Sequence, residues 1–227
     1  MRYPTLDARI SGTYARAVVG VKNKNSLYDS YIRAFRWASD RLGERGIVGF
    51  VTGAGWLDGN AASGIRACFA KEFAHIYVVN LRGNARLKGE LWQKEGDKIF
   101  GQASRSAITL TFLVKDAQIE VPARIHYHDI GDYLKRDQKL GKLKEFESVA
   151  NTPMKQIQPN KEHDWIEQRN DEFKRFLALG TKIDPMTGVF HTQTSGLTTR
   201  RDAWVYNFSS IRLRQTFRRQ WISLITN

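Results

Sequence analysis

Two kinds of hydrophobic pattern alternate over the first 80 residues of the chain. Apolar residues recur every three or four positions over 27–42, behind an N-cap at Ser26, and this spacing predicts an amphipathic helix. A nearly continuous apolar run at 47–52 is typical of a strand that is buried on both faces. The same pair of patterns then returns, with a helix after Asn60 and a buried strand over 75–80. This order predicts a doubly wound α/β fold with a parallel sheet.

The pattern changes after the second strand. Over residues 107–115, Ile108, Leu110, Phe112 and Val114 alternate with Thr109, Thr111 and Leu113, and this alternation predicts a third strand. The 83–106 stretch before it contains several glycines, many charges and no clear helix, so we expect a long loop and antiparallel pairing of the strands that it joins. Farther along, we expect a short strand at 124–128, a lysine-rich helix at 132–146 and a further helix that begins at Asn160.

The chain carries a large positive charge. Its 36 Lys and Arg residues outnumber 23 Asp and Glu residues, which leaves a net charge of +13 and a sequence pI near 10.0. A charge of this size favours a polyanionic partner, either nucleic acid or an anionic membrane surface. The excess is steepest beyond residue 199, where the arginines are Arg200, Arg201, Arg212, Arg214, Arg218 and Arg219.

No segment is expected to cross a membrane, because the longest apolar runs fall far short of the roughly 20 residues that a spanning helix needs. The N-terminus lacks the apolar core of a secretory signal, and Cys68 is the single cysteine. We therefore expect a reducing, cytoplasmic location, with Cys68 as a small buried hydrophobic residue.

Two motifs resemble parts of a dinucleotide-binding site and of a metal site, but their residue spacing does not fit either. The glycine-containing turn 53–59 follows a strand, as in a dinucleotide-binding site, but its third glycine comes four residues after the second instead of three. Asn80 stands where such a site needs an acidic residue, so a nicotinamide or flavin enzyme is disfavoured. His126 and His128 share one face of a strand, but no third or fourth ligand can be named, so we predict structural or surface histidines and no metal site.

The long loop before the third strand combines basic and aromatic residues. Basic side chains neutralise phosphates and exposed rings stack on bases, and together they are typical of a nucleic-acid cleft. The alternative is a solvated loop with two anchoring aromatic residues. The basic residues are Arg82, Arg86, Lys88, Lys94, Lys98 and Arg105, and the aromatic residues are Trp92 and Phe100.

Several segments together resemble the second half of an adenine-N6 DNA methyltransferase. The resemblance is closest to the methyltransferase region of type ISP restriction-modification enzymes, which join nuclease, helicase, methyltransferase and target-recognition parts in one chain. It covers nearly the whole sequence and is carried by KNSLY, IVGFVTGAGWL, NAASGIRACFAKEF, HIYVVNLRG, SRSAITLTFLVKD, RIHYHDIGDYL and RDAWVYNF.

The resemblance implies a partial Rossmann-like methyltransferase core over residues 1–120, with the second half of the sheet and an antiparallel last strand. Residues 121–227 would form a mixed helical and irregular connecting region and the start of a target-recognition domain. The parent activity would be S-adenosylmethionine-dependent methylation of adenine N6 in DNA. The glycine-rich donor turn and the Asn-Pro-Pro-Tyr loop of this family do not occur in the sequence, so we expect a fragment that is inactive alone and binds the donor weakly if at all.

Roles for single residues follow from the same resemblance. Phe100 matches the aromatic residue that stacks on the flipped target adenine, with Trp92 as the less favoured substitute. Leu27 and Tyr28 resemble the segment that closes beneath the catalytic loop. The expected partners are DNA, the missing N-terminal half of the methyltransferase and a second copy of the chain. The alternative is a non-enzymatic, basic nucleic-acid-binding module. The expected DNA contacts are Arg82, Arg86, Lys88, Arg105, Arg200 and Arg201.

Overall fold

The computed structural model of the protein divides the chain into two compact units, Met1–Arg169 and Asn170–Asn227. In the second unit, the helix α8 (Ser210–Ile225) exposes three of its arginines, Arg212, Arg214 and Arg218. None of the described helices is long and apolar enough to cross a membrane. The residues that the structure describes are 3–18, 20–101, 104–119, 122–166, 172, 175–177, 179–180, 188–190 and 208–225.

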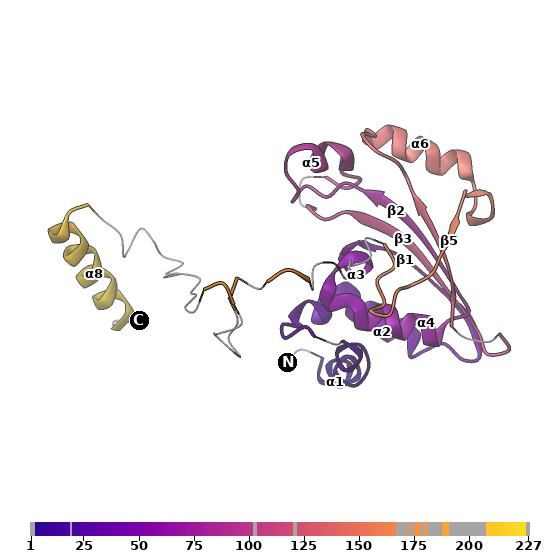
Figure 1. Ribbon diagram of the computed structural model, residues 1–227, viewed down its shortest axis with the longest axis horizontal. Helices are drawn as coiled ribbons and strands as arrows, with labels where there is room; N and C mark the ends of the chain where they lie inside the picture. The colour runs from indigo at the N-terminus through magenta and orange to yellow at the C-terminus, as the bar shows by residue number, and fades with distance from the viewer. Residues whose placement is uncertain are drawn as a thin grey trace. The chain divides into compact units, whose positions relative to one another are not determined.

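A mixed sheet forms the centre of the first unit (Figure 1). Its strand order within the described residues is β1-β3-β2-β4-β5. β3 is antiparallel to both β1 and β2, β2 is parallel to β4, and β4 is antiparallel to β5. This is the mixed α/β sheet expected of a partial Rossmann-like methyltransferase core. The strands are β1 (Arg45–Gly53), β2 (His75–Arg82), β3 (Ile108–Asp116), β4 (Arg124–Asp129) and β5 (Lys155–Ile157).

The predicted antiparallel pairing of the second and third strands is confirmed, and the first two strands run in the same direction, as the predicted parallel sheet implies, but they are not hydrogen-bonded neighbours. β1 and β2 run in the same direction, and β3 lies between them and is hydrogen-bonded to both. The helical connection from β1 to β2 therefore places the two strands one position apart in the sheet. β3, which comes later in the chain, lies between them, and the local pattern does not encode this pairing between distant segments.

β1 is not buried on both faces as its apolar run predicts. Within the described residues it has a neighbouring strand on one side only. Val48 packs into the core beneath the sheet, whereas Ile47 and Val51 on the opposite face are 67% and 56% exposed. The apolar run thus correctly predicts a strand, but it does not predict that both faces of the strand are buried.

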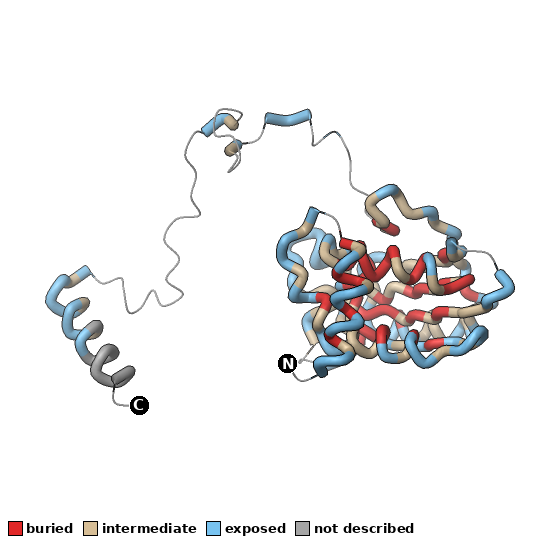
Figure 2. Tube along the Cα trace, turned by 90° about the horizontal axis from the view of Figure 1, so that it is seen from below, coloured by how far each residue is buried: buried red, intermediate tan, exposed pale blue. Residues whose placement is uncertain are grey.

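The helices that precede β2 in the chain cover one face of the sheet (Figure 2). The helix predicted behind Ser26 instead begins at Ser30 after an N-cap at Asp29, because Asn25–Tyr28 forms a separate 3-10 turn that buries Leu27. Elements on or near this face are α1 (Pro4–Ile10), a π-helical turn (Ser11–Ala15), α2 (Ser30–Ser39), α3 (Gly55–Asp58), a 3-10 turn (Asn60–Ala62) and α4 (Ser63–Glu72).

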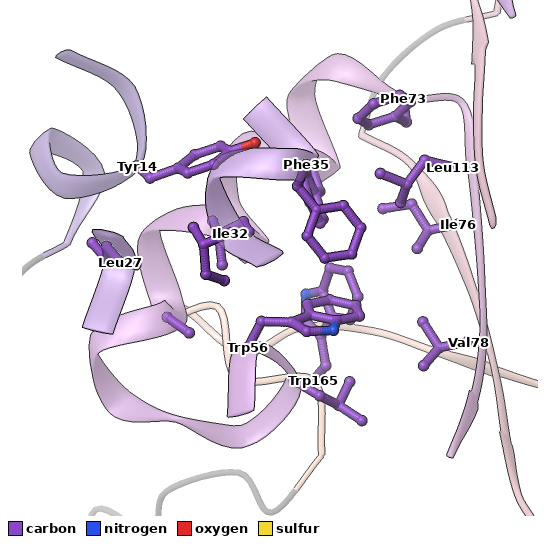
Figure 3. Close-up of a cluster of buried hydrophobic side chains, with 14 of the residues drawn as sticks. Tyr14, Leu27, Ile32, Phe35, Trp56, Phe73, Ile76, Val78, Leu113 and Trp165 are labelled. Carbon is purple, nitrogen blue, oxygen red and sulfur yellow. The ribbon is translucent and has the colours of Figure 1, made fainter. Parts of the chain in front are cut away.

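Aromatic side chains fill the main core (Figure 3). The ring of Trp56 makes edge-to-face contacts with Phe35 at 5.7 Å, with Phe69 at 5.7 Å and with Trp165 at 5.5 Å between ring centroids. Cys68 lies half-buried beside this cluster, and burial raises the pKa of its thiol to about 11. The thiol is therefore protonated at neutral pH.

Trp165 joins the core from a segment predicted to be helical, and that prediction is wrong for the described residues 161–166. The side-chain oxygen of Asn160 accepts hydrogen bonds from the backbone N–H groups of Glu162 and Asp164, which makes a turn rather than a helix start. Most of the remainder of the predicted helix, to Leu177, lies outside the described residues.

A smaller core lies on the opposite face of the sheet, at the carboxyl end of β2. Its buried members are Val79, Leu81, Ile99, Ile108 and Ile130, and α6 (Arg136–Phe146) packs against them through Leu143 and Phe146. The sheet continues beyond residue 120 through β4 and β5, inside the unit that ends at Arg169. The functional division at residue 120 stays a prediction.

Candidate nucleic-acid interface

The chain between β2 and β3 forms a basic hollow of about 650 Å³. Four cationic side chains line it within the described residues, and Trp92 lies among them. Asp97 is the acidic residue of the described lining. We call this site the basic hollow; its cations are Arg86, Lys88, Lys98 and Arg105. The structure therefore brings together three of the predicted DNA contacts and adds Lys98.

Short local structures build this loop. One of them is α5 (Gly89–Glu95), a seven-residue helix that the sequence pattern does not predict. None of its residues is buried. It ends at Gly96, whose φ of +64° suits glycine. A Cβ added at Gly96 would lie 2.2 Å from the carbonyl oxygen of Leu134, so only glycine fits this close approach. The wall of the basic hollow is thus held against the segment that leads into α6.

Both aromatic candidates are half-exposed. Trp92 on α5 is 51% exposed and lines the basic hollow, and Phe100 is 52% exposed directly after the buried Ile99. Rings that present half of their surface to solvent are available for stacking on a base. Which of the two rings meets a target adenine stays a prediction.

Arg82 differs from the other predicted DNA contacts because its guanidinium is already paired. Its Nε lies 2.7 Å from Oδ1 of Asp129, and its Nη1 lies 2.5 Å from Oδ1 of Asp132. The backbone of Arg82 also has a φ of +56°, which turns the chain out of β2. This geometry favours a role for Arg82 in shaping the loop, while Arg200 and Arg201 lie outside the described residues.

Leu27 and Tyr28 lie in different surroundings. Leu27 is buried in the main core, and Tyr28 lines a second hollow of about 710 Å³ together with Pro4, Asp7 and Arg33. In this hollow the Nε atom of Arg33 donates to Oδ1 of the buried Asp7 at 2.7 Å. The predicted support of a catalytic loop by these two residues stays a prediction.

The histidines of β4 have partners outside their own strand. Nε2 of His126 lies 3.2 Å from Nδ1 of His75 on β2, and its ring stacks on Tyr77 at 4.5 Å between centroids. Nδ1 of His128 lies 3.0 Å from the carbonyl oxygen of Pro153. Among the described residues, the structure contains no group of three or more histidine, cysteine or acidic side chains that could hold a metal ion.

Sequence reasoning missed two residues of α6 that contact the loop of the basic hollow, Arg136 and Lys139. Four of the eleven residues of this helix are basic, so the sequence alone does not distinguish Arg136 and Lys139 from the other cations of α6. Their role becomes visible once α6 is placed beside the loop.

No protein-family model and no curated protein matches the chain. Solved structures do match it over almost its whole length. The ATP-dependent type ISP restriction-modification enzyme LlaBIII, bound to DNA, shares 39% sequence identity over 95% of this chain and 14% of that chain, with a TM-score of 0.86. A nuclease-deletion mutant of the type ISP enzyme LlaGI, in complex with a DNA substrate mimic, shares 40% identity over 96% of this chain and 17% of that chain, with a TM-score of 0.84.

The chain is similar to one part of type ISP restriction-modification enzymes. A third structure, the DrdV–DNA complex, shares 32% identity over 95% of this chain and 22% of that chain, with a TM-score of 0.83. The chain spans between 14% and 22% of the length of these three proteins. The resemblance stated from the sequence is confirmed at the level of the restriction-modification enzyme, and the three structures named here are complexes with DNA or a DNA mimic.

Proposed function

We propose that the chain is a DNA-contacting part of the adenine-N6 methyltransferase region of a restriction-modification enzyme. The observation that carries the proposal is the basic hollow, which combines four cations with an exposed tryptophan in a chain similar to DNA-bound type ISP enzymes. The net charge of +13 favours the same polyanionic partner. In a cytoplasmic enzyme of this kind, the single thiol of Cys68 stays reduced.

In this proposal the side chains of the loop have separate roles. Arg86, Lys88, Lys98 and Arg105 neutralise backbone phosphates and set the position of the duplex. Phe100 stacks on the adenine that has been turned out of the helix, and Trp92 is the alternative.

The turn after β1 does not fit a methyl donor. A Cβ added at Gly59 would lie 2.5 Å from the carbonyl oxygen of Gly55, and one added at Gly55 would lie 3.3 Å from the hydroxyl oxygen of Tyr31. The chain's own atoms thus fill the space at these glycines. S-adenosylmethionine would bind to another part of the parent enzyme, and we expect this chain alone neither to bind it tightly nor to methylate DNA. Micromolar donor affinity in a calorimetric titration would contradict this.

Anisotropy titrations of a labelled duplex at several salt concentrations test the DNA-contact proposal. The affinity of the chain should fall steeply with salt, and each lost phosphate contact should lower the slope of log K against log salt by about 0.9. Arg86→Gln and Lys98→Gln should each reduce this slope. Arg45→Gln is the matched control, because it removes the same charge from the opposite end of the strands, where Arg45 pairs with Asp116. Equal effects of all three substitutions would contradict the basic hollow as the DNA site.

We further propose that the free edge of β1 pairs with another part of the parent methyltransferase. Within the described residues that edge has no partner strand, and Ile47 and Val51 beside it are exposed. Such an edge pairs readily with another chain. The isolated protein should therefore self-associate in sedimentation experiments, and a strand-breaking Val51→Pro substitution should reduce that association.

An upstream methyltransferase half that carries the donor turn and the Asn-Pro-Pro-Tyr loop distinguishes the proposal from its alternative. It should bind this chain and restore adenine methylation, and Phe100→Ala should weaken methylation by about 1 to 3 kcal/mol through loss of base stacking. A non-enzymatic basic nucleic-acid-binding module would bind DNA with the same salt dependence but would restore no methylation. If Phe100→Ala methylates like its parent, the stacking role moves to Trp92 or is abandoned.

A further inference from the structure

The ammonium group of Lys139 lies fully inside the protein although the residue belongs to a highly charged surface helix. Lys139 is 0% exposed, and its Nζ donates one hydrogen bond to the carbonyl oxygen of Glu95 and one to that of Asp97, both at 2.8 Å. Lysine is almost never fully buried without partners, because its charge loses the solvation that water provides. One partner is the carbonyl of Glu95, the last residue of α5, where a helix leaves carbonyl groups without helical donors, and the other is the carbonyl of Asp97 in the turn that follows.

Further contacts join α6 to the same stretch of loop. Nε of Arg136 donates to the carbonyl oxygen of Ile99 at 2.9 Å. The backbone N–H of Asp97 donates to the carbonyl oxygen of Leu134 at 3.0 Å, and the Asp97 carboxylate accepts a 3.3 Å bond from the backbone N–H of Arg136. The segment 95–99 is thus tied to α6 and its lead-in at both ends. Phe100 follows this segment directly, and Asp97 and Lys98 within it line the basic hollow.

We propose that Lys139 and Arg136 are positioning residues that set the conformation of the DNA-contacting loop, so that a helix from beyond residue 120 controls how Lys98 and Phe100 meet DNA. This inference rests on the proposed function and adds that α6 regulates the DNA contact of the loop. The loop would not be a self-contained reader of DNA, because α6 supplies the donors that fix its backbone. A movement of α6 would therefore change DNA contact without touching DNA itself.

The chain offers a matched control on the same helix. Lys142 also donates from its Nζ to a backbone carbonyl, that of Ile130 at 3.0 Å, but among the described residues it has no hydrogen bond to the loop segment 95–99. Lys139→Met and Lys142→Met each remove one ammonium group and keep an apolar stem. They change the net charge equally, so a difference between them in DNA affinity reports position rather than charge. Arg136→Gln is a milder second variant, because Arg136 is an exposed residue whose loss leaves the helix interior intact.

Two measurements on the whole chain test the inference. Hydrogen exchange of the backbone amides over 95–101 should be at least tenfold faster in Lys139→Met than in Lys142→Met, with amides of β2 and β3 unchanged. DNA affinity at low salt, well below the unfolding temperature, should fall at least threefold in Lys139→Met relative to Lys142→Met, and Arg136→Gln should move both quantities in the same direction. A purely structural role would lower the unfolding temperature without changing the DNA affinity of the folded protein.

Each other outcome counts against the inference. The inference is overturned if the two lysine variants exchange equally, if exchange is faster throughout the chain, or if the loop exchanges faster while DNA affinity is unchanged. If Lys139→Met does not fold, the inference is overturned when Arg136→Gln leaves both loop exchange and DNA affinity unchanged. If the proposed function is wrong, Arg86→Gln and Lys98→Gln affect DNA binding no more than Arg45→Gln does. The exchange measurement still shows whether α6 holds the loop, so the two failures can be told apart.

Discussion

Arg66 and Asp164 form an ion pair inside the protein although 98 residues separate them in the chain. Nη2 of Arg66 lies 3.1 Å from Oδ1 of Asp164, and the two side chains are 0% and 6% exposed. The same guanidinium donates to the carbonyl oxygens of Trp56, Leu57, Gly59 and His163. One side chain of α4 thus anchors both the turn after β1 and the segment that carries Trp165.

Removal of the acidic partner should be strongly destabilising. Asp164→Ala would leave the Arg66 charge buried without its carboxylate, which costs about 3 to 5 kcal/mol of unfolding free energy in comparable pairs. Urea unfolding measures the change. Arg45→Ala, at an exposed pair, should leave the unfolding free energy nearly unchanged. A loss at Asp164 no larger than that at Arg45 would show that the buried pair adds little to the fold.

Two glycines in helices should respond to alanine with opposite signs. A Cβ at Gly64 in α4 would lie 1.9 Å from the carbonyl oxygen of Tyr14, a backbone atom that cannot move alone. Gly64→Ala should therefore lower the unfolding free energy by at least about 2 kcal/mol. At Gly141 in α6 no described atom lies within 4 Å of the added Cβ, so Gly141→Ala should raise it by about 0.5 to 1 kcal/mol. Thermal unfolding of both variants tests this pair of signs.

Stability should fall as the pH is lowered through the range in which histidine titrates. Burial lowers the pKa of His126, and the nearby charges of His75 and Arg124 lower it further. The unfolded chain therefore binds more protons than the folded chain below about pH 6.5, the ordinary pKa of histidine, and the unfolding free energy decreases there. Burial also lowers the pKa of His163, which adds to the loss. His126→Gln should flatten the profile between pH 7 and pH 5 in urea titrations, and an unchanged slope would exclude His126 as a source.

Arg82 and Arg86 should separate stability from DNA contact. Arg82 pairs with Asp129 and Asp132, so Arg82→Gln should lower the unfolding free energy by about 1 kcal/mol and leave the salt dependence of DNA binding unchanged. Arg86 lines the basic hollow, so Arg86→Gln should reduce the salt dependence and preserve stability. Unfolding and anisotropy titrations on both variants measure the two quantities. The reverse pattern would place the phosphate contact at Arg82.

Local hydrophobic periods were enough to locate four of the strands and the helices α2, α4 and α6. The strands predicted over 47–52, 75–80, 107–115 and 124–128 each lie within one or two residues of a strand in the structure. A strand must alternate or bury its side chains along its own length, so its signal is contained in neighbouring residues. The basic and aromatic composition of the loop before β3 is local in the same sense, and it was sufficient to identify the candidate site.

Tertiary structure alone decided the order of the strands and the partners of the charges. The insertion of β3 between β1 and β2 joins segments that no local period relates. Arg82 and Arg86 look alike in the sequence, yet Asp129 at the end of β4 and Asp132 just after it pair with Arg82, whereas Arg86 lines the basic hollow. Lys139 and Lys142 lie on the same helix, yet Lys139 is buried against carbonyls of Glu95 and Asp97, whereas Lys142 is partly exposed and donates to Ile130. Charge is a property of a residue, but whether that charge faces DNA, an acid or the interior depends on groups that the fold brings from far along the chain.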